Sequence, residues 1–374
     1  MKIIINKNLL LQNLQTASKA LAARSNIPAL MGIYLKAQEG KIIIITSNGD
    51  LSIKEEISNA DFKIESDGEC LIPGKLFCDM VRKLNGDDIS LELLQDNMLR
   101  IICGATDGTM NLMEVADYPT PSFNLNGKPI TIQAAQLKEI IRQTTFATAI
   151  SESKPILTGV SFKIYGNKLL AVSTDSFRLS RRSATLNDDY LETNIIVPAK
   201  SLNELSKIVE DKVEAVDIYL DRGRILYSFS NIIFESTLLS GNYPDTTRLI
   251  PTNFPTIVKF NKLELLEAID RVSTMSTNPN AAPVVKLQIA PNGSVTLSSN
   301  TPELGNITDT IVPTETVSMS EIKISFSATY FLDALRAFNS EEVYVKFTGE
   351  IKPFIFEAED DPGLVELVLP MKSE

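Results

Sequence analysis

A threefold internal repeat constrains the fold of this chain more than any other feature of its sequence. Apolar residues at i, i+3 spacing predict an amphipathic helix three times, at 9–21, 134–147 and 262–275. The spaced pairs that define the buried faces are Leu11 and Leu14, Leu137 and Ile140, and Leu266 and Ile269. Three such helices at similar intervals indicate that one structural unit occurs three times.

Two further signatures return with the same period. Pro28, Pro155 and Pro283 are separated by 127 and 128 residues, and each is followed by two predicted strands around a turn with Gly or Asn. A second helix behind a short strand is predicted three times, at 70–84, 195–209 and 324–338. The repeat therefore covers the whole chain.

Each repeat is about a third of 374 residues, which is long enough for an independent domain and too long for a solenoid repeat. We predict an α+β fold with three similar domains, each with two helices packed on antiparallel sheets. The breaks should lie near 126–133 and 251–260, where Pro, Gly and Asn precede a new strand. The predicted domains are 1–126, 127–252 and 253–374.

Composition excludes several kinds of active site. The chain has no histidine, which removes the commonest general base and the commonest metal ligand. Cys70, Cys78 and Cys103 show no CxxC spacing, so we interpret them as buried thiols and not as a disulfide or zinc framework. No phosphate-binding loop, dinucleotide fingerprint or nucleophile elbow is present. We expect no enzymatic activity, no metal and no cofactor.

Neither a membrane span nor a secretory signal is expected, because no apolar run is long enough and the N-terminal residues lack a basic start and a cleavage site. We expect a cytoplasmic protein that does not contact membranes. The acidic pairs Asp87–Asp88, Asp188–Asp189 and Asp360–Asp361 lie in polar stretches, and we interpret them as solvated surface charge.

A net charge of −11 means that any contact with nucleic acid must come from local basic surfaces. Lys and Arg side chains flank the predicted helices, and they would converge if equivalent helices faced the same way. Such a surface would touch phosphates without reading bases. Ordinary solvated helix faces are the alternative explanation.

Residues 171–182, AVSTDSFRLSRR, first suggest an active site. Their counterpart in the first repeat is 44–51, IITSNGDL, which lacks the Arg and the aromatic residue. A feature present in one copy is better explained as a specialised site than as a requirement of the fold.

Several stretches closely resemble the family of bacterial DNA polymerase III beta subunits, the sliding clamps. These stretches are LIPGKLFCDMVRKL, STDSFRLS, GNYPDTTRLIP and the terminal LVLPM. The resemblance covers the whole chain and implies a head-to-tail homodimer, in which each chain forms half of a closed ring. The ring would encircle duplex DNA, with helices lining the hole and sheets forming the outer wall.

The resemblance also implies a pocket for short apolar peptides from the polymerase III alpha subunit, the clamp loader, other polymerases and repair proteins. Its predicted residues, here called the partner pocket, are Leu157, Thr174, Ser176, Phe177, Arg178, Leu179, Pro244, Arg248, Leu249, Leu367, Val368, Leu369, Pro370 and Met371. Leu, Val, Pro and Met can make an adaptable apolar groove, whereas Arg and Thr can hold a peptide's polar groups. A buried terminal strand is the alternative for 367–369.

This sequence departs from the family pattern at Phe177, where His or Tyr is frequent, so this side chain cannot donate a hydrogen bond. The tail also continues through Lys372–Glu374. The resemblance implies that Arg24 and Lys154 lie in loops that face DNA, and we add Lys75 and Lys200 from the helices as further predicted DNA contacts. The alternatives are a non-ring adaptor that uses the same pocket and, less compatible with the missing histidine, a metal-dependent nuclease.

Overall fold

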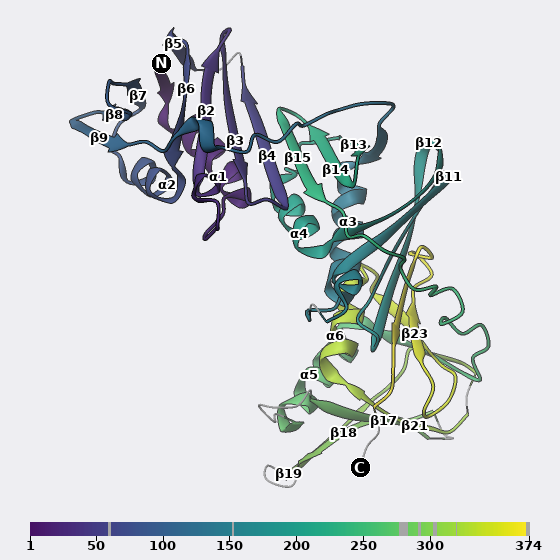
Figure 1. Cartoon of the computed structure of the whole chain (residues 1–374). Helices are drawn as coiled ribbons and strands as arrows, with labels where there is room; N and C mark the ends of the chain where they lie inside the picture. The colour runs from purple at the N-terminus through teal and green to yellow at the C-terminus, as the bar shows by residue number, and fades with distance from the viewer. Residues whose placement is uncertain are drawn as a thin grey trace. The chain divides into compact units, whose positions relative to one another are not determined.

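The computed structural model describes residues 1–58, 61–151, 153–276, 283–290, 293–301, 305–318 and 320–371. The chain packs as two compact units, one with residues 1–137 and 200–238 and the other with residues 138–199 and 239–374 (Figure 1). The middle repeat contributes to both units, because its strands join the sheets of both neighbouring repeats. The tail Lys372–Glu374 lies outside the described residues.

The first repeat alternates strands with two helices. Its strands are β1 (Lys2–Asn6), β2 (Gly32–Gln38), β3 (Lys41–Ser47), β4 (Leu51–Ile57), β5 (Phe62–Ser66), β6 (Gly68–Pro73), β7 (Asp88–Leu93), β8 (Met98–Cys103) and β9 (Thr106–Asn111). Its helices are α1 (Lys7–Ala17) and α2 (Gly74–Lys83), which pack against each other. Short 3-10 helices lie at η1 (Ser18–Ala20), η2 (Pro28–Met31) and η3 (Val115–Asp117).

The middle repeat has the same order with two long strands. Its elements are β10 (Ile130–Gln133), α3 (Ala134–Thr144), η4 (Thr145–Ala147), η5 (Pro155–Thr158), β11 (Gly159–Thr174), β12 (Arg178–Pro198), α4 (Ala199–Ile208), β13 (Ala215–Asp221), β14 (Arg224–Phe229) and β15 (Ile232–Thr237). Residues 159–164 of β11 pair with the end of β12, and residues 168–174 pair with its beginning.

The last repeat closes the chain. Its elements are β16 (Thr256–Asn261), α5 (Lys262–Ser273), η6 (Thr274–Ser276), β17 (Val284–Ile289), β18 (Val295–Thr301), β19 (Gly305–Ile311), β20 (Glu315–Ser318), β21 (Ile322–Ser327), α6 (Ala328–Ala337), β22 (Glu342–Phe347), β23 (Phe354–Glu357) and β24 (Leu364–Val368). Helices α5 and α6 also pack against each other.

The six predicted helices are all present, and the first helix of each repeat continues into a 3-10 turn (η1, η4 or η6) where the prediction had a single helix. Helices α1 and α5 begin at equivalent asparagines. The Oδ1 atom of Asn6 accepts from the backbone N–H groups of Asn8 and Leu9, and that of Asn261 accepts from the N–H of Glu264. These caps satisfy N–H groups that have no partner within the helix.

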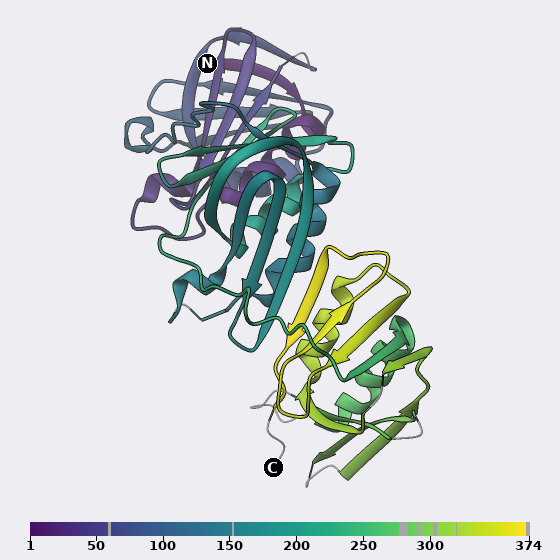
Figure 2. The same ribbon diagram turned by 90° about the vertical axis from the view of Figure 1, so that its right-hand side faces the viewer.

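In the part of the chain that the structure describes, the strands form four antiparallel sheets. Their orders are β5-β1-β7-β8-β9, then β10-β13-β14-β15-β4-β3-β2-β6, then β11-β12-β24-β23-β22-β16-β20, and finally β19-β18-β17-β21. The pairing of β15 with β4 joins the first and middle repeats, and the pairing of β12 with β24 joins the middle and last repeats. Figure 2 shows the yellow strands of the last repeat meeting the teal strands of the middle repeat.

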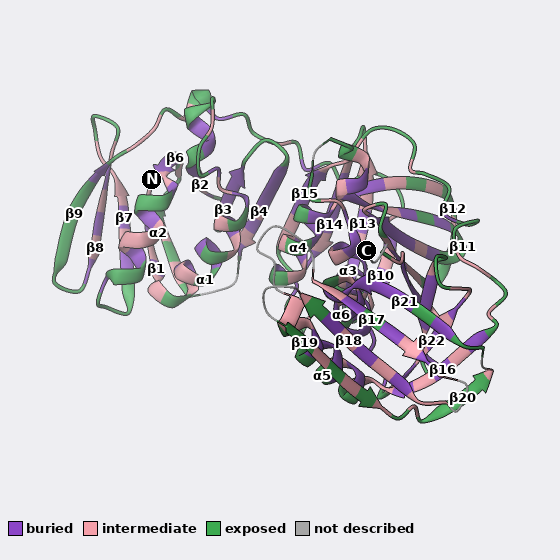
Figure 3. Cartoon of the chain, turned by 90° about the horizontal axis from the view of Figure 1, so that it is seen from below, coloured by how far each residue is buried: buried purple, intermediate pink, exposed green. Residues whose placement is uncertain are grey.

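Helices and sheets bury their apolar faces between them, as the alternating colours of the strands indicate (Figure 3). The predicted faces are confirmed at Leu14, Leu137, Ile140 and Ile269, which are buried. Leu11 and Leu266 were expected on the same faces, but they lie at the edges of the cores and are only partly buried. Their inner neighbours, Leu10 and Leu265, occupy the buried positions.

The cysteine prediction holds for Cys70 and Cys103, which are buried free thiols, but Cys78 on α2 is partly exposed, so its interpretation as buried was wrong. No helix in the described part of the chain has the length and hydropathy needed to cross a membrane.

Candidate functional site

The turn between β11 and β12 is built by its own polar side chains. Asp175 Oδ1 accepts from the backbone N–H groups of Phe177 (2.8 Å) and Arg178 (3.0 Å). Thr174 Oγ1 lies 2.6 Å from the carbonyl oxygen of Arg178, to which it donates, and accepts from the N–H of Ser176 (3.1 Å). Ser176 has a φ of +84°, a conformation that these hydrogen bonds hold in place. The turn therefore presents Phe177 outward, with 59% of its surface exposed.

The first repeat makes the same turn with different residues. Asn48 Oδ1 accepts from the backbone N–H groups of Asp50 (3.1 Å) and Leu51 (2.9 Å), as Asp175 does in the middle repeat. Asp175 is therefore explained by the fold. Arg178 stands where the first repeat has Leu51, and this difference is what distinguishes the middle copy.

The Arg178 side chain interacts with two carboxylates and two aromatic rings of the protein itself. Its Nε donates to Asp175 Oδ2 (3.0 Å) and its Nη1 donates to Asp333 Oδ2 (2.6 Å) on α6. The guanidinium lies 4.5 Å from the centroid of the Tyr330 ring and 5.3 Å from that of Phe146. Its side chain is only 11% exposed. Arg178 thus fixes the turn to α6 through its Nε and Nη1 donors.

Strand β24 lies directly beside this turn. Leu179 pairs with Leu367, and the N–H of Leu369 donates to the carbonyl oxygen of Phe177 (2.9 Å). Leu179 and Leu367 are nearly buried, whereas Leu369 is partly exposed. Val368 is fully buried in the core of the last repeat, so its side chain lies on the other face of the sheet. The alternative of a buried terminal strand for 367–369 is right for Leu367 and Val368, whereas Leu369 follows the strand and is partly exposed.

The segment after β15 supplies the remaining wall. Pro244, Arg248 and Leu249 are exposed, and Leu249 exposes 51% of its surface. Tyr243 fastens this segment to the turn, because its hydroxyl oxygen accepts from the backbone N–H of Thr174 (3.0 Å). Burial raises the pKa of the Tyr243 hydroxyl, which stays protonated.

These walls share one apolar cluster on the sheet surface. It contains Leu170, Val172, Leu179, Tyr243, Ile250, Phe254, Ile355, Val365, Leu367 and Leu369. Of the other predicted residues, Leu157 is buried in η5, Pro370 is partly exposed, and Met371 is exposed with its N–H donating to the carbonyl oxygen of Ser325 (2.7 Å). The structure thus places Thr174, Leu179, Leu367 and Leu369 together, and Leu157 and Met371 in other segments.

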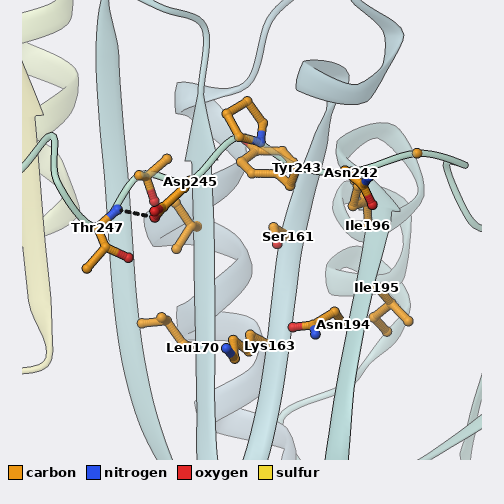
Figure 4. Close-up of a pocket in the computed structure, with 14 residues that line it drawn as sticks. Ser161, Lys163, Leu170, Asn194, Ile195, Ile196, Asn242, Tyr243, Asp245 and Thr247 are labelled. Atoms are coloured by element: carbon orange, nitrogen blue, oxygen red, sulfur yellow. Dashed lines mark hydrogen bonds between the residues drawn. The ribbon is translucent and has the colours of Figure 1, made fainter.

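A hollow of about 390 Å³ adjoins this cluster under the segment 241–247 (Figure 4). Of the predicted pocket residues, Pro244 lines it. Sequence reasoning missed Tyr243, although a signal was available. A Tyr-Pro pair stands at the same place in the first repeat, as Tyr118–Pro119.

A charged and polar network lies behind the turn. Glu366 is fully buried, and burial raises the pKa of its carboxyl group well above the usual range. Ser180 Oγ lies 2.8 Å from Glu366 Oε1 and 2.6 Å from the carbonyl oxygen of Gln143. The Ser180 hydroxyl can donate to the carbonyl oxygen of Gln143, while the protonated carboxyl group of Glu366 donates to Ser180 Oγ.

The neighbouring ion pair corrects one expectation. Asp361, predicted to be solvated, pairs with Arg182 and has a side chain only 17% exposed. Its partner Arg182 is itself largely buried, so this carboxylate belongs to the packed interior of the second unit. Asp360 remains exposed and accepts from the hydroxyl of Ser340.

The four basic residues predicted to contact DNA are all exposed. Lys75 and Lys200 are each the second residue of a second helix, α2 and α4, so they occupy equivalent positions in two repeats. Arg24 and Lys154 lie in the loops before η2 and η5. Among the residues that the structure describes, no group of three or more Cys, Asp or Glu side chains could hold a metal ion.

Family models cover almost the entire chain. The N-terminal, central and C-terminal domains of the DNA polymerase III beta subunit match residues 1–122, 131–245 and 247–372. The chain belongs to the DNA polymerase III beta subunit family. These matches agree with the threefold repeat, and the boundaries at 126 and 252 remain our prediction.

Curated and solved members of this family resemble the chain along its whole length. The beta sliding clamp of Bacillus subtilis is 37% identical over 379 residues, and that of Staphylococcus epidermidis is 34% identical over 378 residues, with all of each chain covered. The crystal structure of the DNA polymerase sliding clamp from Bacillus subtilis is 36% identical, with a TM-score of 0.96 over 100% of both chains. The beta chain from Streptococcus pneumoniae is 33% identical, with a TM-score of 0.95 and the same coverage.

Proposed function

We propose that this chain is the sliding clamp of a bacterial replicative DNA polymerase. Two copies would close head to tail into a ring around duplex DNA, slide without sequence preference, and bind polymerase through the partner pocket. The observation that carries the ring is a regularity in how the repeats join. Full-length likeness to the beta sliding clamps supports the assignment.

The repeats are joined by one rule. The last strand after the second helix of one repeat pairs with a strand of the preceding repeat: β4, the third strand after the first helix, or the start of the long strand β12, which matches β4. In this way β15 of the middle repeat pairs with β4, and β24 of the last repeat pairs with the start of β12. Two strands with these positions are left at sheet edges, β9 of the first repeat and β19 of the last.

Edge strands present unpaired N–H and C=O groups and are templates for another chain. The first repeat offers β9, whose residues are mostly exposed, and the last repeat offers β19 (Figure 3). Pairing β9 of one copy with β19 of a second would apply the same joining rule a third time. Because the two surfaces differ, the contact is heterologous, and two such contacts close a dimer.

The DNA contacts would be few and electrostatic. Arg24, Lys75, Lys154 and Lys200 are exposed cations on a chain whose net charge is −11. Contacts of this kind with phosphate are independent of base sequence and weaken with salt. Processivity would then come from topological linkage, which permits sliding.

The partner pocket would take a short apolar segment of each partner. Among the predicted residues, Phe177, Leu249 and Met371 are exposed, and Leu369 is less exposed. We infer that the polymerase III alpha subunit, the clamp loader, other polymerases and repair proteins bind here in turn. The protein would perform no catalysis, need no cofactor and work in the cytoplasm, where the chromosome is replicated.

Retention on DNA of two topologies tests the ring. The clamp, loaded by its loader, should remain on closed circular DNA and leave the same DNA within minutes after a single restriction cut. Gel filtration of the loaded complexes before and after the cut measures this. Equal loss from both forms would favour the non-ring adaptor, which has no topological linkage.

A further inference from the structure

Two stacked tyrosine rings lie on one face of the sheet in the first repeat. Tyr34 on β2 stacks on Tyr118, with ring centroids 5.7 Å apart and planes 14° from parallel. The hydroxyl group of Tyr34 donates to Glu69 Oε2 (2.6 Å) on β6. The chain after β9 that carries Met113 and Tyr118 is here called the covering segment. It is attached to the sheet because the N–H of Met113 donates to the carbonyl oxygen of Leu71 (2.8 Å).

The middle repeat has the same covering segment. The N–H of Leu239 donates to the carbonyl oxygen of Ile196 (2.9 Å), which repeats the bond made by Met113. The segment then reaches Tyr243, which is followed by proline as Tyr118 is. Farther on, Asp245 Oδ1 accepts from the N–H of Thr247 (2.9 Å) and stabilises the segment over the sheet (Figure 4).

One ring is missing in the middle repeat. Tyr34 is the second residue after Gly32, which pairs with the proline that ends β6. Ser161 is the second residue after Gly159, which pairs with the proline that ends β12. Ser161 therefore stands in the place of Tyr34. By the same registers, Asn194 stands in the place of Glu69.

The hollow described above occupies the space where the first repeat has its second ring. It is lined by Ser161, Lys163, Leu170, Val172, Asn194 and Tyr243, among others, and Figure 4 shows Ser161 below Tyr243. We call it the ring socket. A cavity of roughly 150 Å³ is enough to bind benzene, so about 390 Å³ leaves room for a phenol ring. Asn194 offers an amide oxygen where Glu69 accepts the hydroxyl of Tyr34.

The ring socket adjoins the apolar cluster that contains part of the partner pocket. Val172 and Tyr243 line the socket and belong to the same apolar cluster as Leu179, Leu367 and Leu369. We propose that the ring socket receives a tyrosine side chain from the polypeptide that docks in the partner pocket. This inference rests on the proposed function, because it extends the same binding surface by one subsite.

The inference is tested with p-cresol as a probe, on one variant in which the socket is filled and one in which a second socket is created. p-Cresol, the side chain of tyrosine, should bind the wild-type chain, measured by protein NMR shifts during titration. Ser161→Tyr should abolish that site, because it restores the ring pair of the first repeat. Tyr34→Ser should add a second site under Tyr118. Binding of p-cresol to Ser161→Tyr with unchanged affinity would overturn the proposal.

Thermal denaturation midpoints serve as the control that each variant is folded. If Ser161→Tyr alone is unstable, the double variant Ser161→Tyr with Asn194→Glu restores the hydrogen-bond partner found in the first repeat, and it must give the same loss of p-cresol binding. If Tyr34→Ser fails to fold, the Ser161 variants alone decide the outcome.

Peptides separate this inference from the proposed function. A peptide from the polymerase segment that binds the clamp is prepared with Tyr or Ala at each flanking position. One Tyr peptide should bind wild type about 3- to 10-fold more tightly than its Ala counterpart, and Ser161→Tyr should remove only this gain. Equal affinity of all Tyr and Ala peptides for wild type refutes the socket and leaves the pocket standing. If no polymerase peptide binds at all, the proposed function fails.

Discussion

Arg178 stabilises the folded protein, in addition to its predicted contact with a partner peptide. Two carboxylates and two rings surround its guanidinium, and only 11% of the side chain is exposed. Arg178→Ala would leave Asp175 and Asp333 without their shared cation. Removing one partner of a largely buried ion pair costs about 3 kcal/mol. We expect this loss in the free energy of unfolding, measured by urea denaturation, together with weaker binding of partner peptides.

A matched exposed pair provides the control. Lys41 Nζ lies 2.6 Å from Glu56 Oε1, but both side chains are substantially exposed. Lys41→Ala should cost much less than Arg178→Ala, because solvent screens such exposed pairs. An equally small loss in Arg178→Ala would contradict the anchoring role, and full rescue by Arg178→Lys would show that charge without the planar guanidinium is enough.

Glu55 makes stability depend on pH. It is buried on β4 at the junction with β15, where it pairs with Ile232, and burial raises its pKa to about 9. Because the pKa is about 4.3 in the unfolded chain, the folded state holds this proton more tightly. The stabilisation is therefore largest at low pH and is lost as pH rises from about 5 through 9.

Replacing this carboxyl with an amide isolates its contribution. Relative to wild type, Glu55→Gln should gain at most about 1.4 kcal/mol in free energy of unfolding per pH unit between pH 5 and 9. Urea midpoints of the first unfolding transition at pH 6 and pH 8.5 measure this difference. Glu56→Gln, at the adjacent and more exposed position, is the control. Parallel pH profiles for wild type and Glu55→Gln would refute the assignment.

Sequence comparison between repeats showed that the turn at 174–178 differs from its counterpart but could not give its geometry. The absence of Arg and an aromatic residue from 44–51 singled out Phe177 and Arg178 as differences between the copies. The carboxylate of Asp333 lies 155 positions away, so no local pattern could show that it pairs with Arg178. The same limit applied to Asp361, whose partner Arg182 comes from a different repeat.

At the scale of elements, strand β9 is the part of the first repeat that the ring would need most. A proline in this strand removes one N–H group, and successive residues direct their N–H groups to opposite sides. Of Gly108→Pro and Thr109→Pro, one should therefore lose an outward-facing donor. That variant should shift the dimer to monomer in native mass spectrometry at micromolar concentration.

The opposite edge of the same sheet supplies the control. Strand β5 is the other edge, and Lys63→Pro changes it without altering β9. This variant should remain a dimer. Dimers for both β9 variants would exclude β9 as the interface and would leave the ring without its proposed contact.

The helices and most strands were predictable because apolar spacing and prolines recur at a fixed period. Which strands join the same sheet was not predictable from the sequence. The joining of β15 to β4, and of β24 to β12, depends on edges that meet in three dimensions. The helix ends were also imprecise, since the last turn of each first helix tightens into a 3-10 turn that leaves the apolar pattern unchanged.

At the scale of the whole molecule, the proposed function requires an acidic chain to bind a polyanion through a few exposed cations. Replacing Arg24, Lys75, Lys154 and Lys200 with alanine removes up to four phosphate contacts. The slope of log affinity against log salt should then fall by up to about 3.6, because each contact contributes about 0.9. Fluorescence anisotropy of the unloaded protein with a short duplex, over a salt series, measures this slope.

Four exposed lysines on strands give a control with the same loss of charge, since the ring model places sheets on the outer wall. Their replacements are Lys41→Ala, Lys63→Ala, Lys168→Ala and Lys323→Ala. The control should change affinity slightly through net charge and leave the salt slope near that of wild type. Both variants should still remain on closed circles once loaded, because topological linkage needs no individual contact. A helix-and-loop variant that loads normally but leaves circles as fast as it leaves linear DNA would show that charge, and not linkage, retains the protein.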